Sequence, residues 1–186
     1  MCSVLAQRVD HTVYVLDELV LPDSNTPAAC AAFLDRTKHL LPQGPVPLPV
    51  PVQIYGDATG DSRNTAASRT DWKIIRDFFD TKKAAFVASI RVPSSNPPVK
   101  DRINCVNARL CNSLQERRLL IDPRCRQLIR DLEQVSWKTD ANGNPLIELD
   151  KSDPLRTHTS DALGYYVAFA FPMQASVGPR PFWLGV

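Results

Sequence analysis

The sequence lacks any apolar run long enough to cross a membrane. Its longest apolar stretches, such as residues 162–172, fall short of the roughly 20 residues that a membrane-spanning helix needs. No signal-peptide pattern precedes the first strand-like segment. Charge of one sign is not in excess either, because 22 Lys and Arg against 20 Asp and Glu leave a net charge of +2. Net charge alone therefore gives no argument for a nucleic-acid or membrane partner.

The cysteines include no pair with the two-residue spacing of a zinc knuckle or a redox motif. There are five of them, an odd number: Cys2, Cys30, Cys105, Cys111 and Cys125. We therefore expect reduced thiols in a cytosolic compartment.

What the sequence does contain is typical of one globular domain. A length of 186 residues allows a single core. Hydrophobic residues make up 44% and charged residues 23%, which excludes a disordered, collagen-like or disulfide-framework chain. Strand-like and helix-like segments alternate, and two hairpins are predicted. We therefore expect one domain over residues 1–186 with an α/β fold, in which helices flank a mixed sheet and a β-hairpin is added.

The first third of the chain contains a predicted hairpin, a helix and a connector. Alternating apolar residues predict strands over residues 3–7 and 11–20. Thr26 is the predicted N-cap of a helix over residues 28–39. Five prolines in residues 41–52 forbid a helix and favour an extended connector rather than a docking motif.

The middle of the chain contains two more strands and two helices. Residues 52–55 form a short apolar run that delivers Asp57 at its carboxyl end. A helix capped by Thr70 or Asp71 follows through residue 79, and residues 84–91 are again strand-like. After the prolines 97 and 98, a helix begins whose apolar stripe comprises Val99, Ile103, Val106 and Leu110.

The last third contains a strand, two helices and a hairpin. Residues 119–121 form a short strand, and Asp122 followed by Pro123 predicts the start of a helix with residues 128, 129, 132 and 135 facing inward. Residues 137–149, broken at 140–143, predict the second hairpin. Asp153 and Pro154 repeat the cap-plus-proline pattern, so a final helix should run through residue 158 towards residue 171.

Polar residues on the final predicted helix suggest a site. His158, Asp161 and Tyr165 share one face. A His/Asp pair at this spacing is most often a surface hydrogen bond, and an aspartate after a strand, such as Asp57, most often caps a turn. Together they favour a site, because open α/β sheets bind ligands at the carboxyl ends of their strands, where a helix can bring a second acid over the first.

Converging carboxylates without cysteine ligands suit the hard cations Mg²⁺ or Mn²⁺. Two such ions about 3.5 to 4 Å apart would stabilise the attacking water and the leaving oxygen in phosphodiester hydrolysis. The pattern therefore indicates a metal-dependent nuclease as one hypothesis.

Four blocks of the sequence resemble the C-terminal nuclease domain of tailed-phage terminase large subunits. They are Val-Leu-Asp-Glu-Leu with Pro-Asp-Ser-Asn-Thr in residues 15–26, Tyr-Gly-Asp-Ala-Thr-Gly at 55–60, Ser-Ser-Asn-Pro-Pro-Val-Lys-Asp-Arg-Ile-Asn-Cys-Val-Asn at 94–107, and Thr-His-Thr-Ser-Asp-Ala-Leu-Gly-Tyr at 157–165. The blocks occur in order over most of the chain, and the last is the most specific.

The resemblance implies an RNase H-like fold in which acidic residues hold two metal ions, Mg²⁺ or Mn²⁺. Proteins of this family cut concatemeric double-stranded DNA during phage genome packaging. By this resemblance Asp57 matches the second acid and Asp161 the acid on the last helix, both as metal ligands and catalytic residues. His158 matches a histidine found before that acid in part of the family, as an auxiliary ligand or a group that orients the attacking water.

The chain also departs from the family. The family's first acid lies on a first strand, in an Asp-Phe-Asn-like segment ahead of the residues that resemble 1–7. We expect that strand to be missing here, together with the N-terminal ATPase domain, since there is no Gly-x-x-x-x-Gly-Lys-Ser/Thr loop. Asp10 in a turn is no substitute, and Glu18 is expected to be structural. The chain would then be part of a larger protein or a degenerate prophage remnant.

Basic residues follow or flank the predicted acids. They are Arg63, Arg69, Lys73, Arg76, Lys100, Arg102 and Arg109, the last three on the expected polar side of the helix that begins near residue 99. Charged helix faces are commonly just solvated, but next to the acids they would hold DNA phosphates without reading sequence. We select Lys73, Lys100 and Arg102 as candidate nucleic-acid-binding residues. The hairpin at 137–149 would touch DNA or cover a sheet edge.

The leading hypothesis is a metal-dependent DNA endonuclease of phage packaging in the cytoplasm of the bacterial host, weak or inactive as this chain because the first acid is absent. The resemblance implies double-stranded DNA, a portal protein and a small terminase subunit as partners, and no membrane. Two alternatives stay open: a non-catalytic remnant of the same fold that docks DNA or portal, and a resolvase-like nuclease acting on branched DNA.

Overall fold

The computed structural model describes residues 1–41, 48–61, 69–83, 85–150, 152–153 and 156–173. The predicted class is confirmed: the fold is mixed α/β, with helices flanking a mixed sheet and an added β-hairpin. Within this part of the chain, no helix is long and apolar enough to span a bilayer. Most of the proline-rich connector, as well as Arg63 and Pro154, lie outside the described residues.

The main sheet has three strands. β1 (Cys2–Val9) and β2 (Thr12–Val20) form the predicted antiparallel hairpin, with Asp10 in the turn at a φ of 52°. β5 (Leu119–Ile121) lies parallel to β2 on its other side, which makes the sheet mixed.

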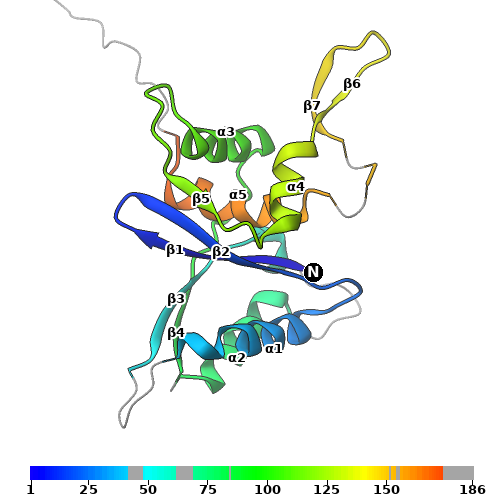
Figure 1. Cartoon of the computed structure of the whole chain (residues 1–186). Coiled ribbons are helices and arrows are strands. Elements are labelled where there is room, and N and C mark those ends of the chain that lie inside the picture. Colours follow the sequence, from blue (N-terminus) through cyan, green and yellow to red (C-terminus); the bar gives the residue numbers. More distant parts are fainter. Residues whose placement is uncertain (42–47, 62–68, 84, 151, 154–155, 174–186) are drawn as a thin grey trace, which may run out of the picture.

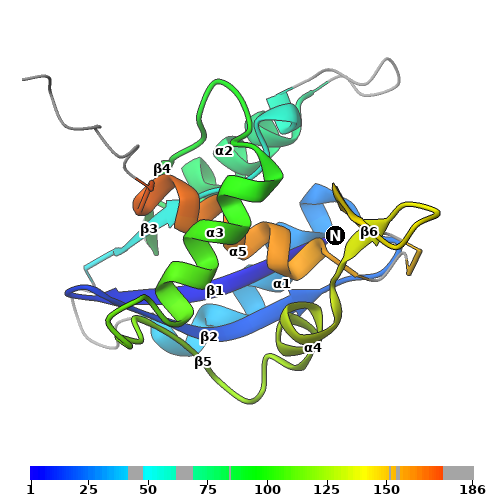
Figure 2. The same ribbon diagram turned by 90° about the horizontal axis from the view of Figure 1, so that it is seen from above.

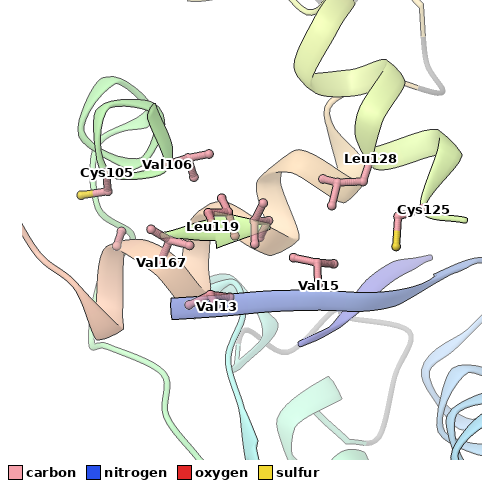
Figure 3. Packing of buried hydrophobic residues seen from close by; sticks show 10 residues of the cluster. Val13, Val15, Cys105, Val106, Leu119, Cys125, Leu128 and Val167 are labelled. Atoms are coloured by element: carbon pink, nitrogen blue, oxygen red, sulfur yellow. The ribbon is translucent and has the colours of Figure 1, made fainter. Parts of the chain in front are cut away.

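Three helices cover one face of this sheet: α3 (Val99–Leu110), α4 (Arg126–Gln134) and α5 (His158–Ala170). The alternation of β2 turns Val13 and Val15 towards these helices, where they are almost fully buried (Figure 3). Leu119, Leu128 and Val167 complete the centre of the core. The core therefore fixes the position of α3 and α5 relative to β2.

A second group of elements lies on the other side of β1 and β2 (Figures 1 and 2). It comprises α1 (Thr26–Thr37), the parallel strands β3 (Val50–Ile54) and β4 (Phe86–Ile90), and α2 (Asp71–Thr81). Three aromatic rings pack where α1, α2 and β4 meet, with centroids 5.7 to 5.9 Å apart: Phe33, Phe79 and Phe86. Among the described residues, β3 and β4 share no strand pairing with the main sheet.

The second predicted hairpin is present and stands beside α4 (Figure 1). β6 (Trp137–Thr139) and β7 (Pro145–Leu149) are antiparallel. Gly143 in the turn has a φ of 84°, a conformation that glycine adopts without steric cost.

Two helices begin later than the sequence predicts because their caps come from distant residues. α4 begins at Arg126, and the Glu18 carboxylate accepts hydrogen bonds from the backbone N–H groups of Gln127 and Leu128, both at 2.8 Å. The structural role expected for Glu18 is therefore to cap α4. Asp122 instead accepts from the backbone N–H of Arg124 in the turn before the helix.

α5 likewise begins at His158, not near Asp153. The fully buried Asp131 of α4 accepts from the hydroxyl of Thr159 at 2.6 Å and from the backbone N–H groups of Thr159 and Ser160 at 3.2 Å. A carboxylate at this position satisfies N–H groups that the helix itself leaves unpaired.

The predicted cap of α1 is also displaced by one residue. Asn25 is the N-cap and accepts from Ala28 N–H, whereas the hydroxyl of Thr26 donates to Asp71 at the start of α2. Thr70 caps α2 through Lys73 N–H, as one of the two predicted alternatives.

Candidate functional site

Asp57 lies in the loop that follows β3, at the carboxyl end of a strand as predicted. Two glycines let this loop pack on Trp72 of α2, because a Cβ at Gly56 or Gly60 would lie 2.8 Å from the Trp72 indole. The indole N–H also donates to the Asp57 carbonyl at 2.9 Å. The buried tryptophan therefore fixes the backbone of the candidate acid.

The Asp57 carboxylate is surrounded by neutral donors. Its Oδ1 accepts from Asn96 Nδ2 at 2.6 Å and from the backbone N–H and the hydroxyl of Thr59, both at 2.7 Å. Burial by itself raises the pKa of Asp57, but the hydrogen bonds from Asn96 and Thr59 outweigh it and hold the pKa below its ordinary value.

Asp161 lies in the first turn of α5 and has a cationic partner. The Arg102 guanidinium donates to Asp161 Oδ1 at 2.9 Å, and its side chain is only 8% exposed against 25% for the aspartate. The guanidinium also stacks on Tyr165, with its Cζ 4.3 Å from the ring centroid. Asp161 is thus neutralised from α3 inside the protein.

Tyr165 connects the two acids. Burial raises the pKa of Tyr165; the Arg102 charge opposes this, while the charges of Asp57 and Asp161 raise the pKa further. Arg102 stacks on Tyr165 and pairs with Asp161, while Asn96 lines a hollow with Tyr165 and donates to Asp57. These contacts join Asp57, Tyr165, Arg102 and Asp161 in one network.

The predicted position of Arg102 is wrong. It was expected on the polar side of its helix, but the buried face of α3 comprises Arg102, Cys105 and Val106, while Val99 of the predicted stripe is 37% exposed. The apolar periodicity missed this rotation because it treats every arginine as a solvent residue. A guanidinium with a carboxylate and an aromatic ring as partners can be buried.

The other predicted site residues are exposed. His158 occupies the first position of α5. Lys73 on α2 pairs with Asp77 at 3.2 Å, and Lys100 is exposed in the first turn of α3. Their predicted roles in catalysis and DNA binding stay predictions.

Asn96 and Thr59 are site residues that sequence reasoning missed. Asn96 donates to Asp57 and also accepts from Ala58 N–H at 2.8 Å, so it holds the loop at two points. Both residues lie in blocks that carry the family resemblance, and Asn96 precedes two prolines, but neither signal indicates which carboxylate they contact.

Concave surfaces flank the network. A pocket of about 220 Å³ between α3, α4, α5 and the second hairpin is lined by residues that include Arg102, Asp161 and Trp137. On the other side, Asn96, Tyr165 and Phe169 line a more open hollow of about 370 Å³.

The donor chemistry of the site fits a divalent cation only in part. Asp57 and Asp161 supply the oxygen ligands that Mg²⁺ and Mn²⁺ prefer. Yet no group of three His, Cys, Asp or Glu residues that could hold a metal occurs in the described part of the chain, and Arg102 already compensates Asp161. These residues alone therefore do not complete the two-ion arrangement.

No protein-family model matches the sequence, and no curated protein matches it. A comparison with solved structures finds the nuclease domain of the large terminase g2p of bacteriophage SPP1, in a crystal structure with bound Mn. The two chains are 19% identical, the match covers 88% of this chain and 75% of the other, and the TM-score is 0.47. The matched protein is a member of the family that the four sequence blocks resemble. Because the identity and TM-score are low, we argue the function from the residues of this chain.

Proposed function

We propose that the chain is a DNA endonuclease domain whose site is built on Asp57 and Asp161. The observation that supports the proposal is a chain of contacts between the two acids. Arg102 pairs with Asp161 and stacks on Tyr165, and Tyr165 lines a hollow together with Asn96, which donates to Asp57. Such a convergence of two acids at the carboxyl end of a strand is the arrangement that the sequence predicts for phosphodiester hydrolysis.

Each residue of the network has a separate role in this proposal. Asp57 is kept ionised by Asn96 and Thr59, so it is available as an oxygen ligand at neutral pH. Arg102 holds the Asp161 carboxylate in place. A divalent ion, when bound, supplies Lewis-acid stabilisation of a phosphate oxygen. A two-ion site needs at least one further acid, which we propose lies outside these residues.

The sequence blocks extend the proposal to phage genome packaging. The substrate is then concatemeric double-stranded DNA, with a portal protein and a small terminase subunit as partners, in the cytoplasm of the bacterial host. His158, at the start of the helix that carries Asp161, is proposed as an auxiliary ligand or a group that orients water. A resolvase-like activity would be distinguished by a preference for branched over linear DNA.

A second candidate is a non-catalytic module that binds DNA or portal. The Arg102–Asp161 ion pair favours it, because an aspartate already paired with a buried cation is a weaker metal ligand. Under this reading the ion pair is structural and no cleavage occurs.

The test is cleavage of supercoiled plasmid with millimolar Mn²⁺. We expect weak nicking by the chain, since an incomplete electrostatic site typically costs on the order of 10²-fold or more in rate. Asp57→Asn and Asp161→Asn should each abolish it. The control is Asp35→Asn, which removes an exposed carboxylate on α1.

Nicking that survives both active variants would refute the assignment of the site. No nicking by any of these proteins would establish the non-catalytic candidate instead.

A further inference from the structure

Two arginines from separate elements lie against one aromatic ring. Arg109, in the last turn of α3, has its Cζ 3.8 Å from the centroid of Phe171. Arg8, at the end of β1, has its Cζ 5.3 Å from the same centroid. Phe171 directly follows α5, so the cluster joins three elements at one point of the surface.

These cations are not neutralised by acids. Arg8 donates to the Asp10 carbonyl at 2.8 Å, and Arg109 donates to the His11 carbonyl. Within the described residues, no carboxylate forms an ion pair with Arg8 or Arg109.

The surroundings of Arg109 are those of a site that favours an anion. Burial lowers the pKa of Arg109, and the nearby charges of Arg118 and Arg8 lower it further. Its Nε is buried and donates no hydrogen bond in the described structure. Like charges held together in a partly dry environment repel one another, and a bound anion would relieve that repulsion.

An aromatic path leads from this cluster towards Asp57. Tyr166 contacts Phe171 with centroids 6.2 Å apart, and Tyr55 contacts Tyr166 at 4.8 Å and Phe169 at 5.4 Å. Phe169 is 42% exposed. Tyr55 precedes Asp57 by two positions in the chain. Phe169 also lines a hollow with Asn96, which donates to the Asp57 carboxylate, so the aromatic path ends near the acid.

We infer that this arginine–aromatic patch, formed by Arg8, Arg109, Tyr55, Tyr166, Phe169 and Phe171, binds the phosphodiester backbone of DNA beside Asp57. Guanidinium groups contact phosphates without reading bases, and the exposed ring of Phe169 can stack on a base that leaves the helix. The inference rests on the proposed nuclease function, because it says where the DNA substrate of that nuclease would bind. Arg109 is one of the basic residues that the sequence places near the acids, whereas Lys73, Lys100 and Arg102 lie outside the patch.

The test separates DNA binding from cleavage. Fluorescence anisotropy of a labelled DNA duplex is measured in EDTA at several salt concentrations, with a second duplex of unrelated sequence and a single strand. The variants are Arg8→Gln and Arg109→Gln. The control is Arg130→Gln, which removes an exposed arginine on α4, away from the turn between β1 and β2 (Figure 1).

Arg8→Gln should weaken binding of both duplexes by about eightfold at 0.1 M salt and reduce the slope of log K against log salt by about 0.9, the value of one phosphate contact. Arg109→Gln should do at least as much. The control should change affinity less than twofold.

Arg8→Gln keeps the test valid if loss of Arg109 unfolds the chain, because Arg8 is exposed. Equal effects of Arg8→Gln and Arg130→Gln, or no DNA binding by the wild type, would overturn the inference. Neither result depends on metal or cleavage, so the nuclease proposal can fail while this one stands. Tighter binding of the single strand would indicate that the aromatic residues stack on unpaired bases. Tighter binding of the duplex would indicate that the patch contacts the phosphate backbone.

Discussion

The two ends of helix α5 differ in whether their charged side chains are paired. At its first turn, the Asp161 carboxylate is compensated by the buried guanidinium of Arg102. Just past its last turn, Arg8 and Arg109 gather on Phe171, and the described residues supply no acid to pair with them. Both signs agree with the helix dipole, which favours anions at the N-terminus and cations at the C-terminus.

The difference separates two roles. The ion pair at the start of α5 stabilises the fold, whereas the arginines past its end are available to bind a ligand. An ion pair closed within the protein contributes to the folded structure and must be opened before Asp161 can take a metal. Cations left without acids contribute little to folding and keep their charge for a ligand. Substitutions at the two ends should therefore separate stability from binding.

The largest expected effect comes from Arg102→Met, which keeps most of the buried stem and removes the charge. Asp161 would lose its partner, and the free energy of unfolding should fall by about 3 kcal/mol. Urea denaturation measures this. The double variant Arg102→Met with Asp161→Asn should recover much of the loss, because the uncompensated carboxylate is then gone. A single-variant loss below about 0.5 kcal/mol would show that the ion pair does not hold the site.

The next effect concerns metal. Millimolar Mn²⁺ should raise the melting temperature of the wild type, since a ligand that binds only the native state stabilises it by about 1.4 kcal/mol at ten times its Kd. Asp57→Asn should erase most of this gain, while Asp35→Asn should keep it. Equal shifts in all three proteins would place the ion elsewhere.

A smaller effect should appear in acid. The pKa of Asp57 is lower in the folded state than its ordinary value, so this carboxylate stabilises the fold at a pH above about 4, and the contribution is lost as the pH falls through the folded pKa. Asp57→Asn should therefore lose less stability than the wild type between about pH 4 and pH 2. Thermal melts across this range measure the difference, and parallel curves would argue against the hydrogen-bonded carboxylate.

The smallest effect should come from Arg8→Gln. Because Arg8 is exposed and lies near other cations, its loss should change the free energy of unfolding by less than about 0.5 kcal/mol. Urea denaturation beside Arg102→Met gives the direct contrast. A loss as large as that of Arg102→Met would mean that stacking on Phe171 is structural, and the two ends of α5 would then be alike.

The elements that are specified locally could be predicted from the sequence. The hairpin of β1 and β2, the strand that ends before Asp57, and the second hairpin follow from alternation and turn residues in short windows. The sequence also predicts that Asp57 and Asp161 converge, because the carboxyl ends of strands form sites, and this convergence stays a prediction.

What could not be predicted depends on contacts between distant segments. The starts of α4 and α5 are set by carboxylates from other elements, which no local window contains. The burial of Arg102 depends on an acid in another helix. The arginine–aromatic patch is assembled from four segments, none of which is unusual alone.

The two carboxylate caps have a consequence for how the site is placed. Glu18 on β2 holds the start of α4, and Asp131 on α4 holds the start of α5, whose first turn carries Asp161. Hydrogen bonds at the starts of two helices therefore link Asp161 to β2, a strand that carries no site residue. The position of Asp161 thus depends on Glu18 and Asp131 as well as on the core and on Arg102.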